Sequence, residues 1–298
     1  MDSQRSSHRG RLHVRANVFA IALIVVTSLP TPALAQQASG SELTTWRQSD
    51  RGPGQPTSMF GTYIRGGEWL VYPFVERYRD KNFEYSPDEF GHGLDADFRG
   101  TYYATEALIF IGYGLSDRLA FEFEAAVISA EMGKAPDDPS TVPAEIEESG
   151  LGDVEGQLRY RWNNETDRAP EVFSYFETVF PLQKNKQLIG TQDWEFKLGT
   201  GVVRGFSFGT LTARAAMEYD AADGNVALGE MAVEYLKRLN SSFRVYAGVE
   251  GVQDEIEGIF EVQWFLKPNV FLKFNNAFGL TSKATDYAPE FGLMFSFR

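Results

Sequence analysis

From residue 68 onward, apolar and polar side chains alternate with a period of two along much of the chain. Between Leu119 and Val127, the odd-numbered positions are all apolar, while Glu122 and Glu124 stand between them. Successive side chains of a β-strand face opposite sides of its sheet, so this pattern gives the strand one apolar and one charged face. A helix would distribute the same charges around its circumference. The alternation therefore predicts β-strands.

Twelve such segments can be delimited, most of them close to the ~9–11 residues with which a tilted strand spans a bilayer. They cover residues 68–80, 97–113, 118–130, 150–162, 171–180, 193–203, 210–220, 225–237, 243–250, 256–267, 270–280 and 289–297. Three connections after odd-numbered segments (81–96, 131–149 and 181–192) exceed in length every connection after an even-numbered one. Long loops on one side and short turns on the other are typical of bacterial outer-membrane barrels with both termini in the periplasm.

Periodicity alone does not decide whether the apolar faces point inward or outward. A soluble sandwich or a lipocalin-like barrel would bury them, whereas a membrane barrel turns them toward lipid. Twelve strands enclose more space than the eight whose inward side chains just fill a barrel, so charged faces fit inside. We therefore predict an all-β fold, a transmembrane antiparallel up-and-down β-barrel of about 12 strands, over residues 68–298. Aromatic residues near strand ends would form interfacial girdles: Tyr113, Trp162, Trp194 and Trp264.

The charged strand faces would then line the lumen, with acids in excess of bases. The candidate lumen-lining residues are Glu122, Glu124, Asp153, Glu155, Arg159, Arg161, Glu195, Lys197, Arg214, Glu218, Arg244, Glu261 and Lys273. In open water this excess would concentrate cations and disfavour anions. Charges that pair instead, such as Arg159 or Arg161 with Glu195 or Glu155, would close the lumen, because unpaired charge in a narrow interior is costly. Inward-facing Tyr246 and Phe265 are candidates for stacking against a solute.

The first 35 residues have the organisation of a secretory signal peptide. Four arginines precede an apolar run from Val18 to Leu29, and the small-residue sequence Ala33-Leu34-Ala35 follows. Twelve residues give about 18 Å of helix, too short for a ~30 Å hydrocarbon core. We expect residues 1–35 to be cleaved before Gln36 and the protein to be exported to the bacterial outer membrane. Residues 36–67 are polar and rich in turn residues, which predicts a periplasmic N-terminal extension, with a plug inside the barrel as the alternative.

Composition narrows the function classes by exclusion. The chain has no cysteine, which removes disulfides, thiolate zinc sites, iron–sulfur clusters and cysteine nucleophiles. Its formal net charge of −13 argues against binding to nucleic acid. We expect no cofactor. The expected partners are outer-membrane lipid and lipopolysaccharide, the barrel assembly machinery, and small-molecule solutes.

One histidine, His92, remains after the predicted cleavage, and a lipid-modifying enzyme would need it beside a serine. The nearest serine in sequence, Ser86, has no recognisable context, and the chain contains no G-x-S-x-G element. A loop histidine and a protein without enzymatic activity are the favoured interpretation.

The connection at 131–149 carries an excess of acids over one base, Lys134. These acids are Glu131, Asp137, Asp138, Glu145, Glu147 and Glu148. Carboxylates could hold Ca²⁺ or Mg²⁺ and bridge the loop to anionic lipopolysaccharide. The spacing of a calcium-binding loop is absent, which favours solvated surface charge.

Four short motifs add a family resemblance over residues 68–298. They are Gly112-Tyr-Gly-Leu-Ser-Asp-Arg118, Gly150-Leu-Gly-Asp-Val154, Lys267-Pro-Asn269 and the closing Phe291-Gly-Leu-Met-Phe-Ser-Phe297. With them the chain resembles the transporter-like outer-membrane family labelled for the meta-pathway of phenol degradation. The resemblance implies a channel or uptake barrel for passive passage of small molecules, including aromatic or hydrophobic compounds, and implies no residue-level mechanism.

One departure from other outer-membrane barrels stands at the end of the sequence. These barrels usually finish on an aromatic residue that the assembly machinery reads, and here Arg298 follows Phe297. The alternatives to a channel are a plugged structural or surface-interaction barrel and, less favoured, an outer-membrane lipid-modifying enzyme.

Overall fold

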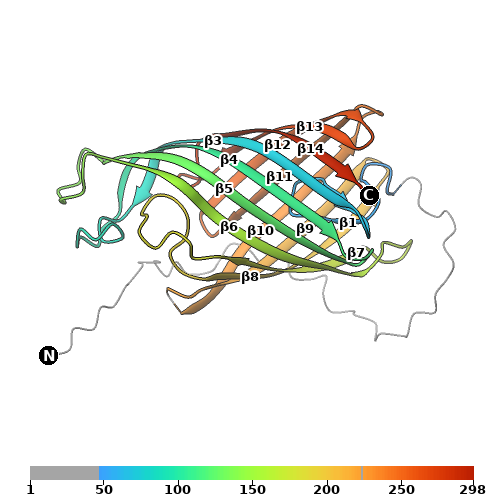
Figure 1. Cartoon of the computed structure of the whole chain (residues 1–298), viewed down its shortest axis with the longest axis horizontal. Coiled ribbons are helices and arrows are strands. Elements are labelled where there is room, and N and C mark those ends of the chain that lie inside the picture. Colours follow the sequence, from blue (N-terminus) through green and yellow to red (C-terminus); the bar gives the residue numbers. More distant parts are fainter. Residues whose placement is uncertain (1–46, 223) are drawn as a thin grey trace.

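Twelve long antiparallel strands close into a barrel in which neighbours in the chain are neighbours in the sheet (Figure 1). The structure is a computed structural model that describes residues 47–222 and 224–298, so the predicted signal peptide lies outside the described residues. The barrel strands are β3 (Trp69–Tyr85), β4 (Phe98–Gly114), β5 (Leu119–Gly133), β6 (Glu145–Asn163), β7 (Glu171–Val179), β8 (Glu195–Phe206), β9 (Gly209–Asp220), β10 (Asn225–Arg238), β11 (Phe243–Val252), β12 (Glu255–Lys267), β13 (Val270–Gly279) and β14 (Ala288–Phe297). Pairing of β14 with β3 closes the ring. The predicted up-and-down barrel is confirmed.

The predicted segments agree with the strands to within a few residues at most ends, but three strands run further toward the long loops. β3 extends to Tyr85 rather than residue 80, β5 extends to Gly133, and β6 begins at Glu145 rather than residue 150. The pairing continues there, with Glu131 opposite Glu147. Beyond the apolar band neither face of a strand meets lipid, so the sequence loses its alternation although the backbone ladder continues.

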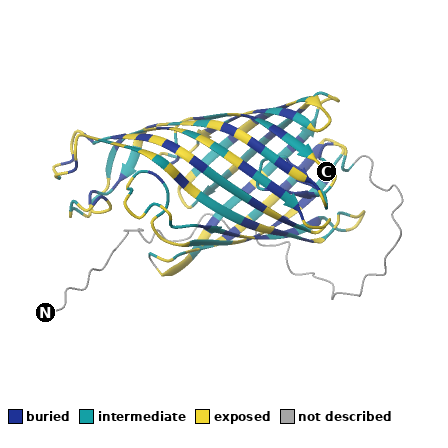
Figure 2. Ribbon diagram, viewed as in Figure 1, coloured by how far each residue is buried: buried dark blue, intermediate teal, exposed yellow. Residues whose placement is uncertain are grey.

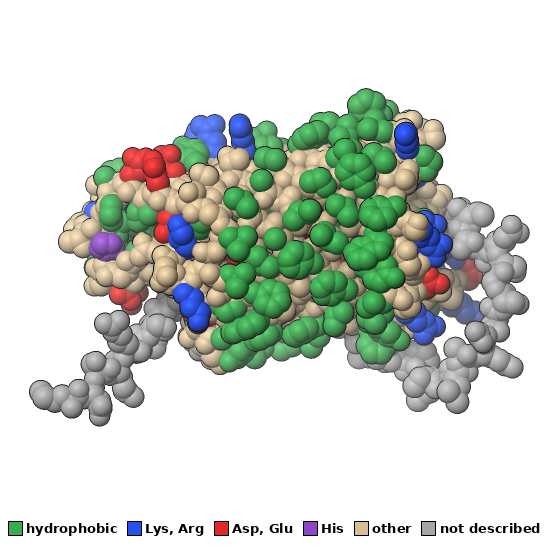
Figure 3. Space-filling view, viewed as in Figure 1, with side chains coloured by type: hydrophobic (Ala, Val, Ile, Leu, Met, Phe, Trp, Pro, Cys, Tyr) green, Lys and Arg blue, Asp and Glu red, His purple; other side chains and the backbone are tan. Residues whose placement is uncertain are grey.

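The apolar faces of the strands point outward. Along β5, Val127 is 59 % exposed, whereas Glu122 on the other face is 2 % exposed. Exposed and buried positions alternate in the same way around the wall (Figure 2). In space-filling view, apolar side chains form a broad band over the visible wall, and charged side chains gather toward both ends (Figure 3). A closed sheet with an apolar exterior is the surface that a membrane barrel presents to lipid.

Aromatic residues mark both ends of this apolar band. At the short-turn end, the ring of Tyr113 lies 4.5 Å from that of Trp69, and Trp162 and Trp264 lie near the corresponding ends of β6 and β12. At the long-loop end, Trp194 precedes β8, with its ring 5.5 Å from that of Phe180. These positions fit two interfacial girdles. No helix within residues 47–222 or 224–298 is long and apolar enough to span a membrane.

Candidate functional site

Residues 50–64 cross the lumen at its short-turn end, and we call this segment the plug. It contains a two-stranded hairpin of β1 (Gln55–Pro56) and β2 (Tyr63–Ile64). On one wall, the backbone N–H and the hydroxyl of Ser58 donate to Glu122 of β5, at 2.9 and 2.5 Å. On another wall, Gln263 of β12 donates to the carbonyl oxygen of Phe60 at 3.0 Å. Because β5 and β12 are separated by several strands in either direction around the ring, the plug spans the interior.

Buried ion pairs hold the N-terminal half of the plug. Arg51 is 2.7 Å from Glu165 and 3.3 Å from Glu171 of β7, and all three side chains are almost fully buried. Arg161 of β6 donates to the carbonyl oxygen of Gly54 at 2.6 Å. Removing one partner of such a pair leaves a buried charge uncompensated, which is strongly destabilising. The charges therefore fix where the plug is seated.

Apolar packing holds the C-terminal half of the plug. The ring of Phe60 stacks on that of Tyr246 at 4.9 Å, and Ile64 lies in a buried cluster with Tyr72. Tyr63 packs in a second cluster beside Leu236. Burial raises the pKa of Tyr63 to about 12, so its hydroxyl stays neutral.

The position of the plug differs from the periplasmic extension favoured for residues 36–67. Residues 50–64 of that segment lie inside the barrel, which is the alternative considered above. Its sequence is polar overall, but the apolar residues Phe60, Tyr63 and Ile64 require cover, and the charge of Arg51 complements acids of the wall. These partners are distant in sequence, so local composition could not indicate them.

The candidate lumen residues all lie on the charged faces of their strands, at different depths. Six are buried: Glu122, Arg159, Arg161, Arg244, Glu261 and Lys273. Six others are partly buried: Glu124, Glu155, Glu195, Lys197, Arg214 and Glu218. Asp153 is exposed at the long-loop rim, where it accepts a hydrogen bond from the backbone of Thr191 at 2.6 Å.

The ion pairs between strands join strands one or two places apart in the sheet rather than opposite walls. Arg159 lies 3.5 Å from Glu122 of β5, and Lys273 of β13 lies 3.1 Å from Glu261 of β12. The hypothetical pairing of Arg159 or Arg161 with Glu195 or Glu155 is not what forms, because those acids lie further along the barrel toward the long loops. Arg161 instead lies 3.8 Å from Glu171.

Several inward acids were absent from the sequence-based candidates. The clearest are Glu171 and Glu177 on β7, where Phe173 and Tyr175 lie between them on the same inner face. β7 carries apolar residues on both faces, so the alternation of its sequence does not show which face points into the lumen. Glu171 and Glu177 are an even number of positions apart, so the sequence places them on the same face of β7. Only the pairing of β7 with β6 and β8 shows that this face points inward.

A cavity of about 200 Å³ lies between the plug and the wall formed by β6 to β11. Phe60 lies on the plug side, and Tyr175 and Tyr246 lie on the wall side. The ring of Tyr175 lies over Gly199 of β8, where an added Cβ would stand 2.1 Å from the ring carbon Cζ. Close approach of the aromatic ring therefore requires glycine at this position. Eight of the other lining residues are charged, and five of these eight are glutamates.

The long-loop end of the barrel is narrowed by the connection between β7 and β8. Ile189 of this connection is 1 % exposed and packs on inward-facing Ala126 and Ile128. The carboxylate of Glu148 accepts hydrogen bonds from the backbone N–H groups of Gln187 and Leu188, at 3.0 and 2.9 Å. This loop is thus folded over the inner face of β4 to β6.

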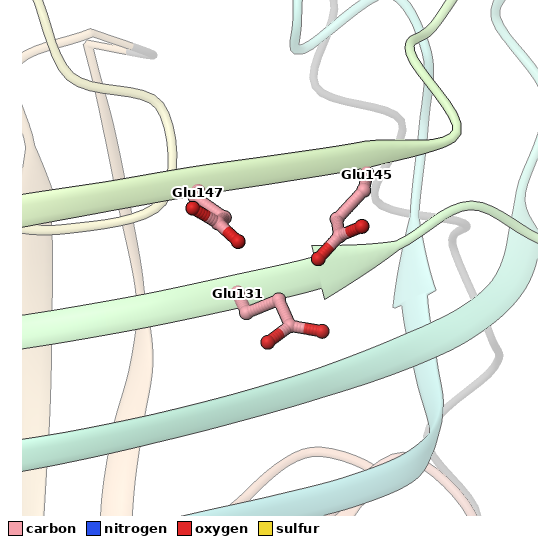
Figure 4. A group of neighbouring side chains, drawn as sticks. All are labelled: Glu131, Glu145 and Glu147. Atoms are coloured by element: carbon pink, nitrogen blue, oxygen red, sulfur yellow. The ribbon is translucent and has the colours of Figure 1, made fainter.

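The acidic segment at 131–149 divides into acids with partners and an exposed cluster. Asp138 accepts a hydrogen bond from the hydroxyl of Tyr85 at 2.9 Å. Glu131, Glu145 and Glu147 are exposed, and their carboxylate oxygens lie within 4.8 Å of one another (Figure 4). The pairing of β5 with β6 produces this proximity. Solvated surface charge remains the expectation for these three acids.

The candidate histidine and serine have separate partners. The Nδ1 atom of His92 lies 2.9 Å from the hydroxyl oxygen of Thr141. The hydroxyl of Ser86 donates to the carbonyl oxygen of Leu94 at 3.3 Å. This arrangement is that of loop residues held by local hydrogen bonds.

Solved structures that align with this chain include outer-membrane barrels. An outer membrane channel from Pseudomonas putida F1 aligns with a TM-score of 0.59 at 10% identity, over 82% of this chain and 99% of that chain. The translocator domain of the autotransporter NalP from Neisseria meningitidis aligns with a TM-score of 0.51 at 8% identity, over 78% and 90% of the two chains. Comparison of the sequence with protein-family models and with curated proteins finds no match. The chain has the fold of an outer-membrane β-barrel, and the resemblance to the phenol-degradation family stays a prediction.

Proposed function

We propose that this barrel is an outer-membrane channel for the passive uptake of small molecules. The observation that carries the proposal is the cavity between plug and wall, which lies within a closed lumen lined by charged groups. A purely structural barrel of this size would favour apolar or fully paired packing in its interior. A lumen that holds charged groups around a cavity is suited to hydrated solutes.

The plug sets the resting width of this pathway. It is held by side-chain contacts, and wall side chains bind two of its carbonyl oxygens, while its backbone hairpin pairs only with itself. We propose that solute passage follows movement of the plug, or the space beside it. The resemblance noted from the sequence supports small aromatic compounds among the solutes, and the apolar outer band supports outer-membrane lipid and lipopolysaccharide as its surroundings.

A plugged structural or surface-interaction barrel is the second candidate, and the buried anchor at Arg51 favours it. If this anchor never releases, the lumen stays closed. The enzymatic alternative depends on His92, and the partner of His92 is Thr141 rather than a serine. We do not propose an enzymatic role.

The test is single-channel recording of the refolded mature protein in a planar bilayer. A channel gives discrete current steps, and a permeating or bound phenol alters their size or duration. A barrel that migrates as folded by heat-modified gel mobility but carries no current supports the plugged alternative and contradicts the channel.

A further inference from the structure

The hydroxyl group of Tyr246 is a buried polar group with no partner in the described part of the chain. Tyr246 is 1 % exposed, and its oxygen has no hydrogen-bond partner within residues 47–222 and 224–298. Buried hydroxyl groups are nearly always hydrogen-bonded, because an unpartnered one has lost its contacts with water without a replacement. The side chain lines the cavity between the plug and the wall. The hydroxyl therefore has unused hydrogen-bonding capacity in a side chain that lines the cavity.

The backbone places this hydroxyl beside two carboxylates. An added Cβ at Gly248 would lie 2.7 Å from the Tyr246 oxygen, so the ring lies over Gly248. The register sets Glu234 of β10 directly opposite Gly248, and Glu250 follows on the same face of β11. Glu234 and Glu250 also line the cavity.

The charges around the cavity leave an excess of acid. Arg214 is shared by three glutamates: it forms an ion pair with Glu230, lies 2.8 Å from Glu234 and lies 2.5 Å from Glu250. Lys197 pairs with Glu177 at 2.9 Å. Glu155 also lines the cavity, and no basic side chain of the described residues lies within ion-pair distance of it. One arginine cannot neutralise three carboxylates, so a cationic guest would complete the charge balance.

The aromatic side chains around the cavity favour a cation that carries an organic group over a bare metal ion. Phe60 of the plug stacks on Tyr246, and the guanidinium carbon of Arg159 lies 5.0 Å from the ring centre of Tyr175. Aromatic faces attract cations in this geometry. A cavity of about 200 Å³ exceeds the ~150 Å³ in which an apolar protein cavity accommodates benzene, so one ring with a short amine fits.

We propose that this cavity binds small organic ammonium ions, with one aromatic ring or its equivalent in size. The ammonium group lies at the Glu234 and Glu250 carboxylates and donates to the Tyr246 hydroxyl oxygen, and the ring packs beside Phe60. This inference rests on the proposed function, since it assigns a solute class to the same lumen. It favours amines over the carboxylates of similar shape, which the acidic lining repels.

The test measures binding to the refolded mature protein in detergent by calorimetry, with three probes of matched size: 2-phenylethylammonium, 2-phenylethanol and phenylacetate. We expect the ammonium to bind at least about 10-fold more tightly than the alcohol, because hydrogen bonds between charged groups are stronger than those made by a neutral hydroxyl. Phenylacetate is expected to bind most weakly.

Variants locate the site. Tyr246→Phe keeps the ring and is expected to weaken 2-phenylethylammonium binding about 10-fold. Glu234→Gln with Glu250→Gln is expected to abolish the preference for the ammonium over the alcohol. Tyr72→Phe is the matched control, because Tyr72 is an equally buried lumen tyrosine that donates to Glu290 on another wall. Gel mobility before and after heating verifies that each variant is folded.

Three outcomes overturn the proposal. They are equal affinity for the ammonium and the alcohol, equal effects of Tyr246→Phe and Tyr72→Phe, and binding of CaCl₂ alone that Tyr246→Phe leaves unchanged. Conductance is recorded separately on the same preparation. Current without ammonium binding contradicts the ammonium site and supports the channel. Ammonium binding without current supports the site and contradicts the channel.

Discussion

At the scale of single residues, the arginines of the short-turn end perform distinct structural roles. Arg51 neutralises two buried glutamates, whereas Arg161 binds a plug carbonyl and Arg159 lies against Glu122. Alternation in the sequence identified Arg159 and Arg161 as inward, because each is flanked by outward apolar residues. Arg51 carried no such signal, since its surroundings are turn residues and its partners, Glu165 and Glu171, lie more than a hundred positions away.

Replacing Arg51 with alanine is expected to destabilise the seated plug by about 3 kcal/mol, because two buried carboxylates lose a close partner. In single-channel recordings the variant spends a larger fraction of time in a high-conductance state. Arg118→Ala is the control, because Arg118 is exposed at the same end of the barrel. Equal open fractions in the two variants contradict this role of Arg51.

Glu68 makes the junction between plug and barrel sensitive to acid. Burial alone would raise the pKa of Glu68, but hydrogen bonds from Arg65 and from Ser296 of β14 outweigh it and hold the pKa below its usual value. A carboxylate with a lowered folded-state pKa stabilises the fold above its unfolded pKa, and this contribution is lost as pH falls through the folded-state value.

We therefore expect Glu68→Gln to reduce the free energy of unfolding at neutral pH by about 1 kcal/mol. In acid, where Glu68 of the wild type is protonated, we expect the two proteins to differ much less in stability. Unfolding temperatures followed by gel mobility at neutral and acidic pH measure this. A constant difference between wild type and variant at all pH values would show that Glu68 acts only through packing.

At the scale of elements, the strands were predictable and the plug was not. Strands such as β5 and β12 present one face to lipid and one to the lumen, so their alternation is strong and their ends are accurate to a few residues. The plug has no regular environment, since neighbouring residues contact different walls. Its position depends on long-range partners, which no local pattern encodes. The folded connection at Ile189 was missed for the same reason.

Deleting the plug is expected to raise conductance several-fold, because residues 50–64 span the short-turn end of the lumen. The deleted segment is replaced by a flexible linker of equal length, and single-channel current is compared with wild type at the same salt concentration. A shortened linker is the control for tether length. Unchanged conductance would place the narrowest point elsewhere, such as the connection at 180–194.

The contact of β7 with β8 depends on glycine under an aromatic ring. Gly199→Ala is expected to destabilise the barrel by about 1–3 kcal/mol, since the new methyl group would displace the ring of Tyr175. Gly258→Ala is the matched control, because its nearest contact would be an ordinary 3.5 Å to Leu280. Unfolding by urea, followed by tryptophan fluorescence, compares the two, and equal midpoints would contradict the packing argument.

At the scale of the whole molecule, the acidic lumen predicts selectivity for cations. Glu106, Glu124 and Glu155 lie on inward faces, and no ion pair joins them to a basic side chain among the described residues. Their triple replacement with glutamine is expected to move the reversal potential in a KCl gradient toward that of a non-selective pore.

The exposed cluster supplies the control for that experiment. Replacing Glu131, Glu145 and Glu147 with glutamine removes three charges that lie outside the lumen wall (Figure 4). Selectivity that changes as much in this variant would assign the effect to the surface potential of the loops. Glu122 is left intact in both variants, because it holds Ser58 of the plug and its loss would also move the plug.

The overall architecture followed from the sequence, while the site did not. Strand number, the outward apolar direction and the unequal loop lengths are repeated many times along the chain, so errors in single segments do not alter the conclusion. The cavity is formed by three parts with different sequence character: the plug, the aromatic pair on β7, and the glutamates of β10 and β11. Only the arrangement of strands around the ring brings them together.

The plug remains covalently attached to β3 through the few residues after Ile64, and this attachment determines how it would behave once released. A segment on so short a tether cannot diffuse away, and its concentration at its own binding surface is on the order of millimolar. Rebinding is therefore a first-order event whose rate does not depend on how much protein is present. A free peptide with the sequence of residues 50–64 would have to reach comparable concentrations to block a barrel that lacks its plug, so one chain supplies both a receptor and a permanently saturating ligand.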